Sequence, residues 1–331
     1  MKAMLVKRSE GVAVLALEEL SDPAPGPGDV LVAVRAASVN RADILQRAGT
    51  YVLNTSSGPE RVGLDVAGDI IAVGDAVQSL HVGDRVMAMT PGGLAERVVV
   101  DAAMAVPLPS TWSYDEGAAA IVALMTEHNA IRAAARLQAG ESILIHAAAS
   151  GVGLQAVQLA RFLGAGTVIA TARSSRAQDL LTSLGANHVI DTSRERFAER
   201  VLDVTRGEGV DVIIDHVGGP YLADNVACAA VRARLVGVGR LGGSRGALDM
   251  ETLALKRMEI IGVTFRTRSA TEKVAIVSAL RNDLDRPGAY ESLRPTVDRT
   301  LPWTEALVAQ EVMESNAHLG KIVLNVSPGS G

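Results

Sequence analysis

The sequence is poor in cysteine and in long apolar runs, and each shortage excludes a class of protein. One of its 331 residues is a cysteine, Cys228, which excludes an intramolecular disulfide framework and a cysteine-rich structural zinc site. We expect Cys228 to be a buried thiol. No apolar run reaches the roughly twenty residues that span a bilayer, and the first residues lack the apolar stretch of a signal peptide. We therefore expect a soluble, cytoplasmic protein without membrane contact.

Aromatic residues are also scarce, and neither sign of charge dominates. The chain has 32 Lys and Arg against 37 Asp and Glu, a net charge of -5, so it has no electrostatic footprint for nucleic acid. Only 3% of the residues are aromatic whereas 48% are hydrophobic. Small aliphatic residues must therefore fill the core, as in parallel sheets that are covered by helices. The length predicts about two domains.

The most informative segment that is present runs from Ser142 to Ala160. A short apolar strand leads through a turn of small residues into an amphipathic helix, and this turn holds Ser150, Gly151, Val152 and Gly153. Such a turn lets backbone approach a pyrophosphate, and the helix directs free N–H groups and its positive dipole end at the phosphate. Ala148 and Ser150 replace two of the three usual glycines. The segment predicts a dinucleotide site.

The form of the dinucleotide is indicated one strand further on. A second strand, Thr167–Ala172, ends where an acidic residue would bind the adenosine ribose of NAD. Arg173, Ser174 and Arg176 follow it instead. Guanidinium and hydroxyl groups stabilise a 2'-phosphate, whereas a carboxylate repels it. We predict NADPH as the cofactor; the alternative is that the arginines are only the solvated face of a surface helix.

The fold class predicted from these patterns is α/β with two domains. Residues 119–265 alternate strand and helix and add four strands to the two above, at His188–Asp191, Val210–His216, Ala233–Val238 and Glu259–Phe265. Six strands with crossover helices make a doubly wound parallel Rossmann sheet, whose ligand lies at the carboxyl ends of the strands. This is the predicted NADPH-binding domain.

Residues 1–118 instead show short strands between Gly and Pro turns, at 30–35, 66–73 and 85–89. Closely spaced short strands are typical of a compact, barrel-like β domain. Residues 266–331 offer a helix or two and a closing strand, Lys321–Asn325, and are predicted to return to this first domain.

Five blocks of sequence together resemble the zinc-independent quinone oxidoreductases of the medium-chain dehydrogenase/reductase family. The blocks lie at 38–51, 87–93, 145–153, 211–219 and 320–324. The resemblance covers essentially the whole chain and is strongest to the tumour-suppressor-inducible type, and weaker to the zeta-crystallin type. It implies a GroES-like substrate domain, a Rossmann domain, a cleft between them, NADPH, and a homodimer. We expect the dimer to form through the sixth Rossmann strand.

The resemblance also implies that no metal is bound. Zinc-dependent relatives have a cysteine where this chain has Asn40, and a cysteine-rich lobe that this chain lacks. Its six histidines show no ligand spacing. Without a Lewis acid, alcohol oxidation is disfavoured, which leaves the reduction of acceptors that are already electrophilic.

Two residues match substrate-cleft residues of the family. Asn40 and Tyr51 are implied to hydrogen-bond a substrate carbonyl, and we take them as the candidate catalytic residues. The alternatives are a turn asparagine and a half-buried tyrosine.

A further set of residues is expected to bind the cofactor, several of them on its nicotinamide side. These are Thr126, His216, Val217, Gly239, Arg240, Leu241, Phe265 and Lys321. Four of them have ordinary alternatives: a helix threonine, a satisfied histidine at a strand end, a solvated arginine and a surface lysine.

Three functions remain open at this point. We favour an NADPH-dependent quinone oxidoreductase that passes a hydride, or single electrons, to a quinone. The runner-up is an enoyl or alkenal double-bond reductase, which needs a proton donor near the α-carbon; Tyr51 is the phenol that we nominate. The third is a cofactor-binding structural or RNA-binding protein, against which the acidic charge argues.

Overall fold

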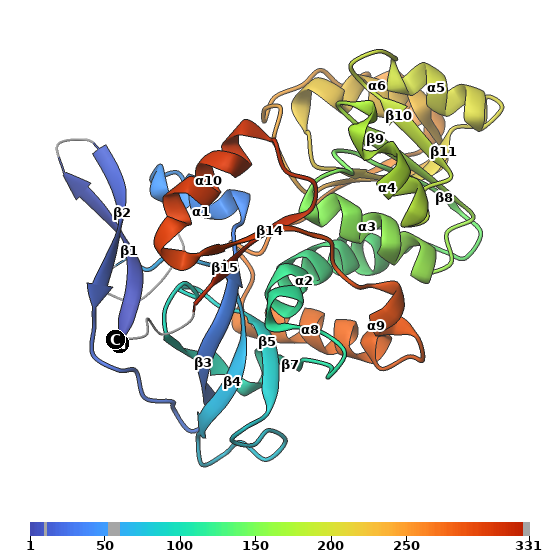
Figure 1. Cartoon of the computed structure of the whole chain (residues 1–331). Helices are drawn as coiled ribbons and strands as arrows, with labels where there is room; N and C mark the ends of the chain where they lie inside the picture. Colours follow the sequence, from blue (N-terminus) through green and yellow to red (C-terminus); the bar gives the residue numbers. More distant parts are fainter. Residues whose placement is uncertain (10–11, 52–59, 327–331) are drawn as a thin grey trace. The chain divides into compact units, whose positions relative to one another are not determined.

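A computed structural model describes residues 1–9, 12–51 and 60–326 of the chain (Figure 1). The chain divides into two compact units. The first unit comprises Met1–Val122, Ser269–Asp285 and Arg294–Gly331, and the second comprises Ala123–Arg268 and Arg286–Leu293. From the sequence we expect functional domains at 1–118, 119–265 and 266–331. These limits remain predictions.

The first unit is built mainly from antiparallel strands. Its strands are β1 (Lys2–Ser9), β2 (Val12–Glu19), β3 (Asp29–Ser38), β4 (Asp65–Val73), β5 (Arg85–Met89), β6 (Arg97–Asp101), β7 (Ala105–Pro107), β14 (Val297–Pro302) and β15 (Lys321–Asn325). Its helices are α1 (Arg41–Arg47), α8 (Ala270–Leu284), α10 (Ala306–Ser315) and the start of α2 (Tyr114–His128). β1 and β2 form a hairpin, and a second sheet has the order β14-β15-β3-β4-β5-β7 with β6 added on β3.

β3 organises this unit because it pairs with three strands. Its first half pairs with β6, its last residues pair with β15, and β4 runs along nearly its whole length. Register shifts between β3 and β4 mark two irregularities in this pairing. A long strand that changes partners in this way folds a sheet onto itself. The predicted GroES-like β domain is confirmed.

The second unit contains the predicted Rossmann sheet. Its strands are β8 (Ser142–Ile145), β9 (Thr167–Ala172), β10 (His188–Asp191), β11 (Val210–Asp215), β12 (Ala229–Gly237) and β13 (Glu259–Gly262). They are parallel, in the order β10-β9-β8-β11-β12-β13. The helices are α3 (Gly151–Phe162), α4 (Gln178–Ser183), α5 (Phe197–Val204), α6 (Leu222–Cys228), α7 (Met250–Lys256) and α9 (Ala289–Ser292). The predicted doubly wound fold is confirmed.

The middle strands of this sheet form the core because both of their faces are covered. Ile143, Leu144 and Ile145 of β8 are fully buried, as are four apolar residues of β11. Continuous β-branched and leucine runs of this kind are typical of parallel strands between helix layers. Helix α3 packs on β8 and β9, and α7 packs on β12. Cys228 is buried in the same core, as expected.

The expected sixth strand, Glu259–Phe265, is too long. β13 ends at Gly262, and its last link to the sheet is the Val263 N–H, which donates to the Gly237 carbonyl. β12 ends at Gly237, so residues beyond Val263 have no neighbour with which to pair. The fifth strand begins earlier than expected, at Ala229, and the fourth ends one residue before His216.

Candidate functional site

The turn between β8 and α3 has the form that a phosphate-binding turn requires. Ser150 begins helix α3 as its N-cap: its Oγ accepts from the Gly153 N–H at 3.1 Å and donates to the Ala147 carbonyl at 2.8 Å. The N–H groups at the start of a helix have no partner within the helix, so Gly151 and Val152 offer theirs to a ligand. A phosphate is the ligand that such an end favours.

Gly153 is required by the close contact between this helix and the turn. A Cβ at this position would lie 2.4 Å from the Ala147 carbonyl oxygen and 2.6 Å from the Ala148 Cα. This is the role of the third glycine of the dinucleotide fingerprint, which allows helix and strand to pack closely. The sequence therefore keeps the glycine that packing demands and replaces the other two by Ala148 and Ser150.

The three basic and hydroxyl residues predicted to bind a 2'-phosphate follow β9 directly. Arg173, Ser174 and Arg176 are exposed, and they lie between the end of β9 and helix α4. β9 pairs in parallel with β8, Ala170 opposite Ile145. The two loops therefore leave neighbouring strands at the same edge of the sheet, which is where this fold binds its ligands.

The loops after β11 and β12 are joined by backbone hydrogen bonds. Leu241 N–H donates to the His216 carbonyl at 3.1 Å, and Gly242 N–H donates to the Val217 carbonyl at 2.9 Å. A Cβ at Gly239 would lie 2.6 Å from the His216 oxygen. The structure thus brings together four predicted cofactor residues, His216, Val217, Gly239 and Leu241. Arg240 is exposed beside them, and Phe265 is half-buried beyond the end of β13.

Asp215 fixes the first of these two loops. Its Oδ1 accepts from the N–H groups of Val217 and Gly218 at 2.7 and 2.9 Å, and its Oδ2 accepts from the Asn225 amide at 3.1 Å. Asn225 Oδ1 in turn lies 2.7 Å from His146 Nε2, and His146 Nδ1 lies 3.0 Å from the Thr171 hydroxyl. This buried chain of polar groups links three strand ends. Sequence reasoning recognised His146 only as a scattered histidine.

Burial keeps His146 neutral. Desolvation in the core lowers the pKa of its imidazole to about 4, against the influence of Asp215 and Asn225. Both ring nitrogens have partners, so His146 positions the strand ends and is not available for metal binding. The parts of the chain that the structure describes contain no group of three His, Cys, Asp or Glu that could hold a metal ion.

His216 faces a buried carboxylate that the sequence did not single out. Its Nε2 lies 3.3 Å from Oε1 of Glu127 on α2, and Glu127 is fully buried. In the sequence, Glu127 could have been noticed only as a single acidic residue at the end of an apolar helical run, directly after Thr126. Thr126 itself is half-buried.

In the first unit, the structure joins Asn40 to Lys321. The Lys321 ammonium, which is buried, donates to Asn40 Oδ1 at 2.8 Å and lies 3.5 Å from Asp65 Oδ2. The amide of Asn40 donates to Asp65 Oδ2 at 2.8 Å and to the Ser38 carbonyl at 3.3 Å. All hydrogen-bonding groups of the Asn40 side chain thus have partners within this unit. Asp65, an acid at the start of a buried strand, was missed by sequence reasoning.

Two other polar residues lie close to this cluster in sequence. The Asn40 N–H donates to Asp43 Oδ2 at 2.7 Å, and burial raises the pKa of the Asp43 carboxyl to about 7. Tyr51 is half-buried, and its N–H donates to the Leu45 carbonyl. The roles of Asn40 and Tyr51 toward a substrate stay predictions.

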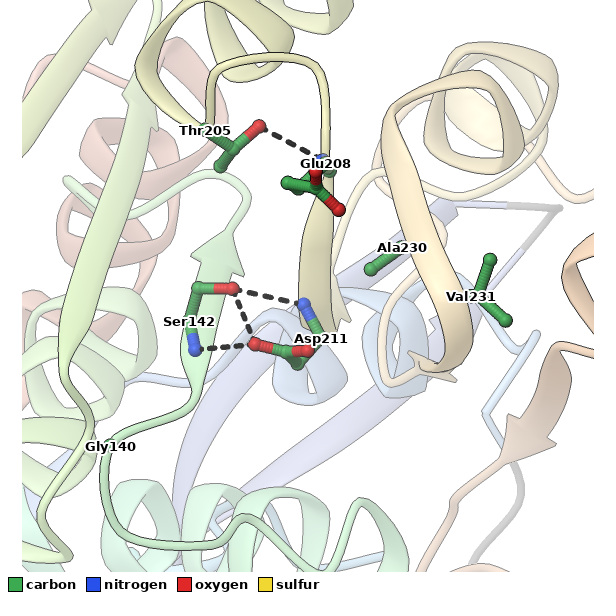
Figure 2. Close-up of a pocket in the computed structure, with 8 residues that line it drawn as sticks. Gly140, Ser142, Thr205, Glu208, Asp211, Ala230 and Val231 are labelled. Carbon is green, nitrogen blue, oxygen red and sulfur yellow. Dashed lines mark hydrogen bonds between the residues drawn. The ribbon is translucent and has the colours of Figure 1, made fainter.

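A surface hollow lies at the opposite edge of the Rossmann sheet (Figure 2). It has a volume of about 470 Å³ and is lined by residues at the amino ends of the strands, among them Ser142, Asp211 and Ala230. The Ser142 hydroxyl donates to the Asp211 carboxylate, so these two polar groups are already paired. Because parallel sheets bind ligands at their carboxyl ends, we assign no cofactor to this hollow.

Comparison with known proteins agrees with the geometry. The model of the alcohol dehydrogenase GroES-like domain matches residues 26–110, and that of the zinc-binding dehydrogenases matches residues 151–279. Quinone oxidoreductase of Rattus norvegicus is 31% identical over 331 residues, which cover 98% of this chain and 97% of the rat protein.

Longer relatives also match. The mycocerosic acid synthase-like polyketide synthase of Mycobacterium tuberculosis is 34% identical over 305 residues, 91% of this chain. The chain spans only 14% of that synthase's length.

Two solved structures have the same fold. CurK enoyl reductase has a TM-score of 0.84 at 29% identity, covering 97% of this chain and 98% of its own. Quinone oxidoreductase from Thermus thermophilus, whose complex with NADPH is also known, has a TM-score of 0.83 at 29% identity, covering 98% of this chain and 100% of its own.

The chain belongs to the medium-chain dehydrogenase/reductase family, and within it to the quinone oxidoreductase type. Among the residues that the structure describes, no helix is both long and apolar enough to cross a membrane.

Proposed function

We propose that the protein reduces quinones with NADPH. The observation that carries the proposal is the pair of loops at the carboxyl ends of β8 and β9: a capped helix start with free N–H groups lies beside a loop with Arg173, Ser174 and Arg176. The first is suited to a pyrophosphate and the second to a 2'-phosphate. The NADPH complex of the Thermus enzyme and the rat quinone oxidoreductase support this assignment.

The residues of the second unit fit NADPH along its length. Gly151 and Val152 would hold the pyrophosphate, the arginine loop would hold the adenosine phosphate, and the joined loops of Val217 and Gly239 would hold the nicotinamide half. Bound NADPH supplies a hydride from its dihydronicotinamide ring. A quinone that accepts this hydride and one proton becomes a hydroquinone, so the site needs hydrogen-bond donors for the acceptor oxygen rather than a metal.

A second candidate, the reduction of a carbon–carbon double bond in an enoyl or alkenal substrate, is favoured by other relatives. CurK is an enoyl reductase, and several curated relatives are polyketide synthases. This reaction places the hydride on the β-carbon and needs a proton at the α-carbon. The Tyr51 phenol is our candidate for the donor of that proton.

A panel of acceptors separates the two functions. NADPH oxidation is followed with ortho- and para-quinones and with conjugated enals and enoyl thioesters, for the unmodified protein and for Tyr51→Phe. We expect the quinones to be reduced fastest. Tyr51→Phe should lower that activity only in part, because it removes one hydrogen bond to the quinone oxygen but no proton that a carbon atom needs. Reduction of the enoyl substrates alone, lost in Tyr51→Phe, would replace the quinone assignment. NADPH binding without turnover of any acceptor would favour a structural protein.

A further inference from the structure

Glu127 and His216 form a buried pair of a carboxyl group and an imidazole, whose contact the proposed function does not use. Glu127 is 0% exposed and His216 is 3% exposed. The Glu127 Oε1 and His216 Nε2 atoms lie 3.3 Å apart, but they are not aligned as a hydrogen bond. Within residues 1–9, 12–51 and 60–326, neither oxygen of Glu127 nor His216 Nε2 has a hydrogen-bond partner.

Burying such a pair without hydrogen-bond partners lowers the stability of the fold. Burial disfavours the charged forms of both groups, and buried polar atoms in folded proteins almost always find partners. Burial by itself lowers the pKa of the His216 imidazole, but the nearby carboxylates of Glu127 and Asp215 together outweigh it and raise that pKa above its ordinary value. The other ionisable group that acts on this ring is His146.

The pair lies next to the loops predicted to hold the nicotinamide half of the cofactor. The His216 carbonyl accepts from the Leu241 N–H, and its neighbours Val217 and Gly218 are held by Asp215. Glu127 directly follows Thr126 on α2, and Thr126 is another predicted cofactor residue. The backbone of His216 is therefore held by its own loop, and its ring lies against Glu127.

We propose that Glu127 and His216 together give the cofactor site a buried cationic donor: Nε2 faces Glu127, and Nδ1–H donates to an oxygen of the nicotinamide half of NADPH. The acceptor is a ribose hydroxyl or the carboxamide carbonyl, both of which present oxygen lone pairs. Glu127 acts through His216 and is a positioning residue. This inference rests on the proposed use of NADPH.

The first test is the pH dependence of NADPH binding, measured by the fluorescence of NADPH without an acceptor. Between pH 7 and 9.5 the 2'-phosphate stays ionised, so its titration does not interfere. The dissociation constant of the unmodified protein should rise about tenfold as His216 loses its proton, since a charged donor becomes a weaker or absent one. His216→Gln should bind about tenfold more weakly at pH 7 and show no such rise.

Two variants separate the pair from a general effect of charge. Glu127→Gln removes the carboxylate but keeps the shape, so the midpoint of the pH dependence should move to lower pH. His188→Gln is the matched control, because His188 is exposed at the start of β10 in the same unit. It should behave like the unmodified protein.

A second readout follows the His216 ring directly. Nitrogen NMR of the imidazole, with His216→Gln for assignment, should show in the free protein a pKa above that of an exposed histidine, which falls in Glu127→Gln. Addition of NADPH should shift the Nδ1 resonance. An imidazole that is neutral at pH 7, or NADPH binding that is insensitive to both variants, would overturn the inference. If the unmodified protein bound no NADPH, the cofactor assignment itself would fail, whereas a neutral ring in a protein that binds NADPH would refute only the pair.

Discussion

At the scale of single residues, Arg173 and Arg176 should decide which dinucleotide is bound. Replacement of both by Ala should remove most of the preference for NADPH over NADH, because two charge-assisted hydrogen bonds to the 2'-phosphate correspond to roughly a hundredfold in affinity. Calorimetric titration with both cofactors measures the preference. Arg194→Ala, on the exposed loop after β10, is the control. Equal affinities for NADPH and NADH in the unmodified protein would refute the assignment.

Asn40 has contacts that make two roles separable. If its amide donates to a quinone oxygen in the reaction, Asn40→Ala should lower turnover tenfold or more with little change in NADPH affinity, since a transition-state interaction of about 2 to 4 kcal/mol is lost. If Asn40 only holds Lys321 and Asp65, turnover should fall no further than in Asp65→Asn, which breaks the same cluster from its other side. Steady-state kinetics and thermal unfolding of the two variants decide between these roles.

His146 makes stability depend on pH in a predictable direction. Its pKa is about 4 in the folded chain and 6.5 without the fold, so the unfolded state takes up the proton first. Stability is therefore fully present above about pH 6.5 and falls as the pH drops toward 4, by up to about 3 kcal/mol. Urea unfolding at pH 7.5 and 5 should show a smaller loss for His146→Gln than for the unmodified protein. Identical losses would mean that His146 is protonated in the folded state.

At the scale of elements, helix α3 should tolerate no side chain at Gly153. Gly153→Ala would place a methyl group 2.4 Å from the Ala147 oxygen, so the helix must move away from β8. We expect a loss of stability of about 1 to 3 kcal/mol and weaker NADPH binding, because the capped turn moves with the helix. Gly262→Ala is the control, since a Cβ there meets no atom within 4 Å. Unchanged NADPH affinity in Gly153→Ala would show that the turn does not hold the cofactor.

The strands of the Rossmann unit could be predicted from the sequence because strands buried on both faces appear there as continuous apolar runs. All six were found, with errors at the ends of β11, β12 and β13. Those ends depend on where the neighbouring strand stops, which a local pattern does not contain. The hairpin of β1 and β2 and the short strands β6, β7 and β14 were missed. β6, β7 and β14 are short and are held by pairing with β3, β5 and β15, whereas β1 and β2 pair with each other.

The parts of the candidate site that depend on a fixed spacing of residues along the chain could be predicted from the sequence. The parts that depend on contact with a residue far away in the sequence could not. Ser150 to Gly153 and the arginine loop follow from the order of strand, turn and helix. Asp65 and Glu127 are recognised only when the fold brings them to Lys321 and His216.

At the scale of the whole molecule, the edge of the Rossmann sheet should form a dimer interface. β13 is the last strand of its sheet, and Ile260 is 45% exposed. An apolar edge strand invites pairing with a second copy across a two-fold axis. The Val263 N–H points inward to β12, so by the alternation of a strand the Ile260 N–H points outward.

Ile260→Pro removes an outward donor without breaking the pairing of β13 with β12. We expect the unmodified protein to be a dimer at micromolar concentration and this variant to be a monomer, as measured by sedimentation velocity. Val82→Pro, an exposed position in a turn of the other unit, is the control. A monomeric unmodified protein would refute the interface.

The three-way pairing of β3 sets an order for folding during synthesis. The second unit is complete once Leu293 has been made, but β3 receives its partner β15 only when Lys321–Asn325 emerges, and Ser38 must then find Val323 far along the chain. Contacts between such distant segments form slowly because a long loop must close. Until then the buried carboxylate of Asp65 lacks the ammonium of Lys321, and the end of β3 is an open edge. The nascent chain therefore holds a finished cofactor unit beside an unfinished one, and the interval between them is when chaperone binding should matter most.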